Sequence, residues 1–187
     1  MTDSDSRLRL TLRQPDGSLT PILPGTAAEL DVVDFVALAA NARFSGRIRL
    51  DAERLSDMLN AHAEFELQQA RAEEIGTGRW RIVSSVVLRR DELLVVLATG
   101  PRGSLLRRRH TIPRTLTVKL GRYIVTGEVH TEPGLDPLLQ LKRRDMVPLT
   151  DAVVRYEGPR GTIEEPVDAV VINRHRIDWA RRSGVLA

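Results

Sequence analysis

Apolar and polar residues alternate over short runs along most of the chain, and this period of two predicts strands rather than helices. Val83–Leu97 (VSSVVLRRDELLVVL) has the pattern of a strand, a tight polar turn and a second strand. Val167–Arg181 (VDAVVINRHRIDWAR) has the same pattern. Because the apolar positions of the two runs coincide after a shift of 84 residues, we interpret the runs as two copies of one hairpin.

The correspondence extends upstream of these hairpins. Phe35–Gly46 matches Leu116–Gly127 without a gap, at an offset of 81 residues. Small insertions at turns explain the change of offset, since loops absorb differences in length at little cost. The sequence therefore predicts a tandem duplication, with residues 31–98 as the first repeat, residues 115–182 as the second, and an approximate twofold axis between them.

Each repeat is predicted to contain five short strands and one short helix. Two-residue connections near Asn41 and at Gly121-Arg122 indicate hairpins. Gly46 and Gly127 fall at equivalent places inside the second strand, where a glycine indicates a bulge, a sharp bend or a close backbone approach. We expect a mainly β fold in which each repeat forms a small barrel or a compact sheet. The pattern leaves open whether the repeats form separate barrels or one shared barrel.

Residues 51–74 permit two interpretations. Their richness in Ala, Glu, Leu, Gln and Arg favours one long helix. The matching segment of the second repeat contains Pro148 and ends in the β-branched and aromatic run Thr150–Tyr156, which a continuous helix cannot include. If the repeats share a fold, each has a short helix followed by a strand, so residues 65–74 would be strand. The helices are then expected near Ala52–Asn60 and Asp136–Arg143, and the strands at Phe65–Glu73 and Val147–Tyr156.

The remaining segments flank the repeats. Residues 1–30 form an N-terminal extension in which Arg7–Gln14 alternates as a strand and Pro15–Gly17 indicates a turn, so this segment is expected to form a hairpin. It has no counterpart in the second repeat, and we interpret it as an added edge or cover. Residues 99–114 are a basic linker, and residues 183–187 are a tail.

The composition is that of a globular protein, with 42% hydrophobic residues. The absence of cysteine excludes disulfides, thiolate metal sites and thiol catalysis. No apolar run approaches the roughly 20 residues that cross a bilayer, and the polar start does not resemble a signal peptide. We expect a cytoplasmic protein without a membrane span.

Arginine dominates the basic residues, since Lys119 and Lys142 are the only lysines among 28. The net charge of +3 is small, but the linker concentrates arginines that can neutralise phosphates. A simpler interpretation of the linker is a solvated connector, and cations that follow the second predicted helix also complement its dipole. The candidate anion-binding residues are Arg102, Arg107, Arg108, Arg109, Arg114, Lys142, Arg143 and Arg144. The aromatic residues that could stack on bases are expected in the core instead: Trp80, Tyr123, Tyr156 and Trp179.

No motif indicates catalysis. The histidines His62, His110, His130 and His175 lack metal-ligand spacing, and Gly100–Ser104 lacks the lysine of a phosphate-binding loop. We therefore expect no cofactor, no metal and no enzymatic activity. The hypothesis is a binding, assembly or regulatory module of unknown ligand, with a protein partner or a second copy of itself. Its alternative is weak, sequence-independent binding of nucleic acid or another polyanion through the arginine-rich segment.

The heptapeptide Arg54–Asn60 (RLSDMLN), followed by a strand and a hairpin, resembles a family of uncharacterised bacterial proteins with an R-L-S-D-x-L-N turn between short strands. The second repeat lacks the Arg, Ser and Asn of this motif at Leu135–Gln140, and the resemblance implies no activity. The residues themselves predict a helical turn capped by Ser56 or Asp57. Its apolar positions are expected to pack inward: Leu55, Met58 and Leu59.

Overall fold

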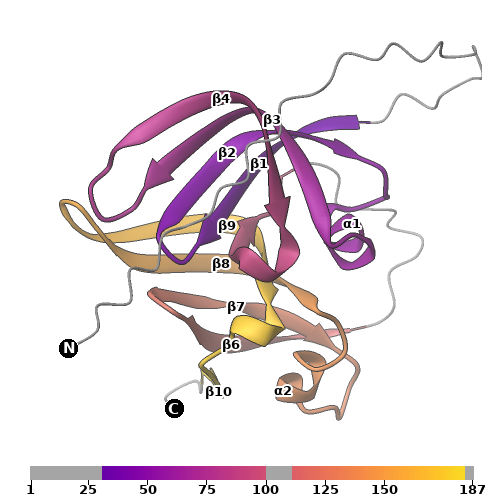
Figure 1. Cartoon of the computed structure of the whole chain (residues 1–187). Coiled ribbons are helices and arrows are strands. Elements are labelled where there is room, and N and C mark those ends of the chain that lie inside the picture. The colour runs from indigo at the N-terminus through magenta and orange to yellow at the C-terminus, as the bar shows by residue number, and fades with distance from the viewer. Residues whose placement is uncertain (1–30, 100–110, 184–187) are drawn as a thin grey trace, which may run out of the picture.

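The structure, a computed structural model, describes residues 31–99 and 111–183. The described residues form one antiparallel sheet of ten strands with two short helices and two 3-10 turns (Figure 1). The predicted mainly β fold is confirmed. Neither of the described helices has the length and apolar character that crossing a membrane requires.

The elements follow the same order twice. The first unit contains β1 (Asp31–Ala39), β2 (Ala42–Leu50), α1 (Leu55–Ala61), β3 (Glu64–Glu74), β4 (Trp80–Arg89), η1 (Arg90–Glu92) and β5 (Leu93–Leu97). The second unit contains β6 (Ile112–Leu120), β7 (Tyr123–Thr131), α2 (Pro137–Gln140), β8 (Met146–Gly158), β9 (Gly161–Asn173), η3 (Arg174–Arg176) and β10 (Trp179–Arg182). Here "first unit" and "second unit" denote these two sets.

The segment with two interpretations is a short helix followed by a strand. α1 ends at Ala61, and β3 begins three residues later at Glu64. β3 pairs with β2 on one side and with β4 on the other. Its ladder hydrogen bonds and the burial of alternate side chains outweigh the helix propensity of its sequence. The prediction of a strand over Phe65–Glu73 is confirmed, and a continuous helix over residues 51–74 is wrong.

The strands lie in the order β10-β6-β7-β8-β9-β5-β1-β2-β3-β4. In each unit the fifth strand lies beside the first, and the units meet where β9 pairs with β5. The sheet is open, because β4 and β10 lie at its two ends, whereas a barrel requires the end strands to pair. Of the two predicted alternatives, a small barrel or a compact sheet, the barrel is therefore wrong. A twofold relation between the units would also require β4 to pair with β10, as β9 pairs with β5. This second pairing is absent from the described sheet, so the predicted twofold axis is not shown.

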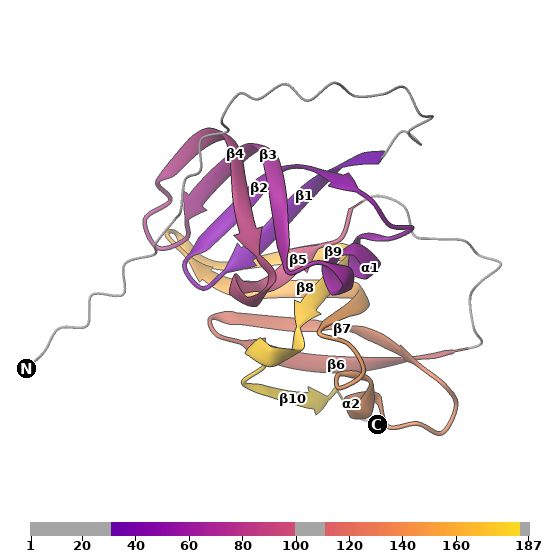
Figure 2. The ribbon, with the colours of Figure 1, turned by 45° about the vertical axis from the view of Figure 1, so that its right-hand side comes forward.

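The core consists of two apolar clusters on opposite faces of the central strands. The first cluster joins β1 to β4 and α1, and the second joins β6 to β9. Adjacent residues of β9 point to different clusters, Val171 to the first and Val170 to the second. β5 is buried along its whole length. The two ends of the sheet thus curl over opposite faces of β5 and β9 (Figure 2).

The two predicted bulge glycines bend their strands in the same way. The β2–β3 pairing shifts register across Gly46, and the β7–β8 pairing shifts across Gly127. The facing strands carry the only non-glycine residues of positive φ among those described, Gln69 (φ 49°) and Asp151 (φ 46°). A Cβ at either glycine would meet a backbone oxygen of the facing strand, at 2.6 Å in the first unit and 3.1 Å in the second. The close backbone approach predicted from the sequence is confirmed.

Two side-chain amides join the units. Asn60 donates to the Met146 carbonyl oxygen (2.8 Å) and accepts from the Met146 amide (3.0 Å). Asn173 donates to the carbonyl oxygens of Arg90 and Leu93, both at 3.0 Å. These bonds satisfy backbone groups at the start of β8 and around η1, and they hold the two units in register.

The RLSDMLN segment is α1 and the turn before it. Its three apolar residues are buried, as predicted. The predicted cap is wrong, because Arg54 occupies the N-cap position and no side chain caps the helix. Asp57 lies within the first turn and forms an ion pair with Arg144 of the second unit (2.9 Å). With Asn60 on the same helix, the motif connects the units.

Candidate functional site at the two free sheet edges

Both end strands of the sheet expose large apolar side chains. On β4 the exposed fractions are 57% for Trp80, 67% for Ile82 and 48% for Val87, and on β10 that of Trp179 is 43%. Neither strand has a partner on its outer side within the described chain. Each edge therefore combines unpaired backbone hydrogen-bonding groups with apolar side chains, which is the combination that another strand can cover.

The exposure of the two tryptophans was not predicted. Tyr123 and Tyr156 are buried as expected, and their rings pack at a centroid distance of 5.4 Å. For Trp80 and Trp179 the expected core position is wrong. An edge strand alternates like an inner strand, so its sequence pattern does not tell which of its sides lacks a neighbour.

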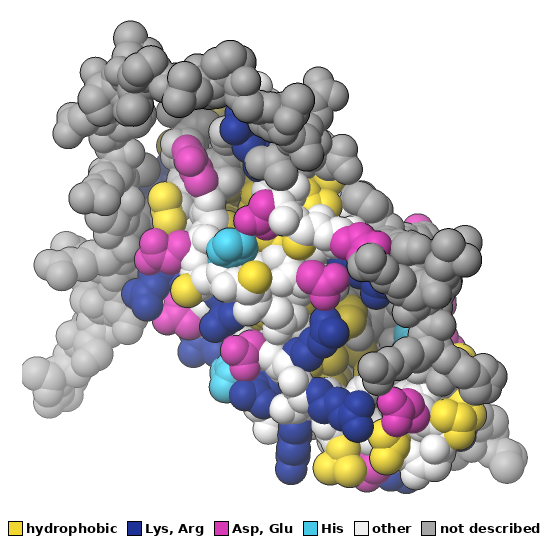
Figure 3. Space-filling view, turned by 90° about the vertical axis from the view of Figure 1, so that its right-hand side faces the viewer, with side chains coloured by type: hydrophobic (Ala, Val, Ile, Leu, Met, Phe, Trp, Pro, Cys, Tyr) yellow, Lys and Arg dark blue, Asp and Glu magenta, His cyan; other side chains and the backbone are white. Residues whose placement is uncertain are grey.

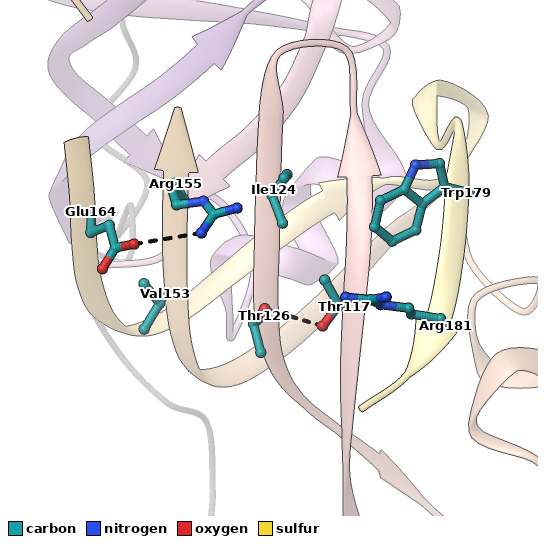
Figure 4. A pocket seen from close by; sticks show the side chains of 8 residues that line it. All are labelled: Thr117, Ile124, Thr126, Val153, Arg155, Glu164, Trp179 and Arg181. Atoms are coloured by element: carbon teal, nitrogen blue, oxygen red, sulfur yellow. Dashed lines mark hydrogen bonds and ion pairs between the residues drawn. The ribbon is translucent and has the colours of Figure 1, made fainter. Parts of the chain in front are cut away.

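The β10 edge borders a hollow of about 340 Å³ on the outer face of the second unit. Figure 4 shows Trp179 and Arg181 at one end of it and Arg155 with Glu164 at the other. The floor between them carries two threonines whose hydroxyls lie 3.2 Å apart. The hollow is lined by Thr117, Ile124, Thr126, Val153, Arg155, Glu164, Trp179 and Arg181.

The hollow is suited to packing rather than to proton transfer. Its one carboxylate, Glu164, faces the guanidinium of Arg155 at 3.8 Å, and no histidine lines it. Each exposed tryptophan also has a guanidinium over its ring, Arg71 at 4.9 Å from the Trp80 ring centroid and Arg181 at 5.5 Å from that of Trp179. Such cation–π contacts hold the rings in place at the surface.

A cluster of charged side chains surrounds Asp145, between α2 and β8. Its carboxylate lies 3.0 Å from His175 Nε2, 3.0 Å from Arg174 and 3.4 Å from Arg90. The hydrogen bond from His175, together with the two guanidinium groups, lowers the pKa of Asp145. Because these partners come from η1 and η3, the cluster ties the two units together. Within residues 31–99 and 111–183, no three acidic or histidine side chains gather as a metal site.

The predicted anion-binding residues are only partly described. Arg102, Arg107, Arg108 and Arg109 lie outside the described residues. Arg114 is exposed on β6, and Lys142–Arg144 form an exposed turn. α2 ends at Gln140 without a basic residue in its last turn, and Lys142–Arg144 follow its C-cap Leu141. Arg144 pairs with Asp57, and Figure 3 shows basic and acidic side chains interspersed on the face that carries the two helices.

These features define a class of protein: an open, coiled antiparallel sheet built from two units of like strand order, with an uncovered apolar edge at each end. No protein-family model, curated protein or solved structure matches the chain. The resemblance of the RLSDMLN segment to a bacterial family stays a prediction.

Proposed function

We propose that this protein is a non-enzymatic binding and assembly module that recruits a partner by adding the partner's strand to a free edge of its sheet. The observation that carries the proposal is the pair of uncovered edges, β4 and β10, each with exposed apolar side chains. Strand addition gains main-chain hydrogen bonds along the edge, while alternate side chains of the added strand select the partner. Proteins that avoid such pairing place charges or proline on their edges. β4 has exposed arginines near its two ends, Arg81 and Arg89, but between them it presents Ile82 and Val87.

We further propose that the two units are copies of one five-stranded ancestor. The order of elements and the strand order within each unit support this. So does the recurrence of a bulge glycine opposite a left-handed residue, Gly46 with Gln69 and Gly127 with Asp151. Under this proposal the pairing of β9 with β5 is itself an example of strand addition, because an edge strand of one unit pairs with an edge strand of the other.

The polyanion alternative has one observation in its favour. The two exposed tryptophans supply aromatic surface on which single-stranded nucleic acid can stack, and each has an arginine over its ring that adds positive charge. Against it, two of the described arginines lie beside carboxylates, since Arg144 pairs with Asp57 and Arg155 faces Glu164. The two functions respond differently to salt: phosphate binding weakens steeply as salt rises, whereas strand addition through apolar side chains does not.

The test is selection of strand-forming peptides. From a displayed library of random peptides of about ten residues, sequences of alternating apolar pattern should bind the full chain. Their amide signals and those of β4 or β10 should shift together in NMR spectra. Val87→Lys and Trp179→Lys place a charge on one edge each, and we expect each to weaken binding at its edge by about tenfold or more.

The matched control is Val32→Lys, because Val32 is 42% exposed but lies on β1, which β2 and β3 separate from the β4 edge. This variant should bind as the wild type does. Failure to select any strand-forming peptide, or equal binding by all three variants, would contradict the proposal.

A further inference from the structure

We infer that the partner at these edges is a second copy of this chain, bound head to tail: β10 of one copy pairs antiparallel with β4 of the next. This inference rests on the proposed use of the free edges and names their occupant. The contact is expected to repeat the pairing that joins β5 to β9 inside the molecule.

The internal junction supplies the template. β5 and β9 pair antiparallel, and the Ala98 amide donates to the Ala169 carbonyl oxygen at 2.9 Å beyond the last pair. The side chains of the junction are buried on both faces of the sheet. The opposed residues are Val95 with Ile172, Val96 with Val171, and Leu97 with Val170.

Each molecule also has two free edge strands that correspond to the two strands of this junction. β4 has the place in the first unit that β9 has in the second, and β10 has the place in the second unit that β5 has in the first. β4 thus lacks a partner like β5, and β10 lacks a partner like β9. The register of the β5–β9 pair, shifted by 84 residues, gives the register expected between β10 and β4. In this register the opposed residues are Trp179 with Leu88, Ala180 with Val87, Arg181 with Val86, and Arg182 with Ser85.

The exposed fractions agree with this transfer. Val171 in the internal junction is 1% exposed and contributes to the first apolar cluster, while its counterpart Val87 is 48% exposed. Val95 is 0% exposed, while its counterpart Trp179 is 43% exposed. The inferred contact would therefore bury Val87 and Trp179, two side chains that the isolated chain exposes to solvent. Val87 would pack on the second cluster of the next copy, as Val171 packs on the first cluster here.

The hollow beside β10 corresponds in position to a surface of the first unit that is covered by other residues. On the outer face of the first unit, Leu38 belongs to the second cluster and Val36 packs against it. The equivalent face of the second unit is the hollow, where Thr117 stands for Val36 and Ile124 stands for Arg43. A second copy would fill this hollow with the end of its first unit.

The inferred contact should be weaker than the internal one. Inside the molecule Arg43 donates two hydrogen bonds to Glu165, at 2.8 and 3.0 Å, and Ile124 cannot repeat this pair. Across the inferred junction Arg181 and Arg182 oppose uncharged residues, so like charges do not face each other directly. We therefore expect reversible association that depends on concentration. Because the two surfaces of the contact differ, it can repeat, and copies will form a ring or a filament.

A disulfide trap tests the register. The chain has no cysteine, so Val87→Cys and Ala180→Cys each introduce a single thiol. Directly opposed residues of an antiparallel pair have Cα atoms about 4.5 to 5.5 Å apart, within the range that a disulfide spans. On mild oxidation, a mixture of the two variants should form a covalent dimer whose linked peptides contain residues 87 and 180.

The control mixture combines Val32→Cys with Ala180→Cys and should give only background cross-linking, because β1 lies away from both edges. Efficient dimers from Val87→Cys alone would show β4 pairing with β4, and this outcome would overturn the head-to-tail arrangement.

Complementation in solution gives an independent readout. We expect the mass of the wild type in sedimentation to rise with concentration, and we expect Val87→Lys and Trp179→Lys each to remain monomeric. Mixing these two variants should restore a dimer and nothing larger, because β10 of the first variant and β4 of the second are intact. Val32→Lys should associate as the wild type does.

The outcomes separate this inference from the proposed function. If peptides bind the edges while the chain stays monomeric and no mixed disulfide forms, strand recognition stands and the second copy is rejected. If the β4 amides are protected from hydrogen exchange in a monomer that no peptide binds, the edge belongs to the chain's own residues 1–30, and both proposals are rejected.

Discussion

At the residue scale, close contacts rather than conformational freedom explain the bulge glycines. A Cβ at Gly127 would lie 2.9 Å from the Ala152 Cβ and 3.1 Å from the Thr150 carbonyl oxygen. We expect Gly127→Ala to lower the free energy of unfolding by about 1–3 kcal/mol, because the overpacked strands must separate. Urea denaturation measures this change.

The matched control for this substitution is Gly76→Ala, since no atom lies within 4 Å of a Cβ built at Gly76. The control should change the free energy of unfolding by less than about 0.5 kcal/mol. Equal effects of the two substitutions would contradict the packing explanation.

Two polar residues, the buried Tyr123 and the half-buried Arg43, show how single side chains position the units. The Tyr123 hydroxyl donates to the Ala39 carbonyl oxygen at 2.7 Å, and burial raises the pKa of Tyr123 well above its ordinary value. Tyr123 therefore keeps its proton and this hydrogen bond up to high pH. The hydrogen bonds to Glu165 raise the pKa of Arg43, so the guanidinium in this contact between β2 and β9 stays charged.

At the scale of elements, the Asp145 cluster holds η1 and η3 against the start of β8. The pKa of Asp145 is lower in the folded chain than in the unfolded chain, whose value is about 3.9. The contribution of Asp145 to stability is therefore complete above that value and is lost as the pH falls through the lower folded pKa. We expect the wild type to lose more free energy of unfolding between about pH 5 and pH 3 than Asp145→Asn.

Asp91→Asn is the control for this pH dependence. Asp91 pairs with Arg89 at the surface, and its side chain is 66% exposed, so its ion pair contributes little. The pH dependence of this variant should follow that of the wild type. Parallel curves for the wild type and Asp145→Asn would show that the cluster does not stabilise the fold.

At the scale of the whole molecule, the shared central strands predict that both units unfold together. β5 contributes side chains to both apolar clusters, and so does β9. The chain has two tryptophans, Trp80 in the first unit and Trp179 in the second. Trp80→Phe and Trp179→Phe therefore leave one fluorescent probe in each unit.

We expect the two probes to report one cooperative transition with the same midpoint in urea, because neither cluster survives the loss of β5 and β9. Measurement at low concentration keeps assembly out of the comparison, and circular dichroism provides the common reference. Two midpoints, one for each unit, would show that the units fold as independent domains.

The candidate site could be predicted only in kind. The absence of catalytic motifs and the alternation of short strands led to the hypothesis of a binding module of unknown ligand, which stays a prediction. The strands that form the sheet edges, and the exposure of Trp80 and Trp179, could not be read from the pattern. The basic residues were the stronger sequence signal, yet the structure engages Arg144 in an ion pair and describes only part of the set.

The sequence by itself determined the strands, their turns and the repeated order of elements, because these depend on local signals. Alternation marks a strand, Gly121-Arg122 marks a turn, and Gly46 with Gly127 marks a close approach of two backbones. Only the tertiary structure decided that the sheet stays open, that β9 pairs with β5 and that β4 and β10 are its ends. The physical reason is that alternation specifies which face of a strand is buried, whereas the neighbours of a strand follow from the coiling and packing of all strands together.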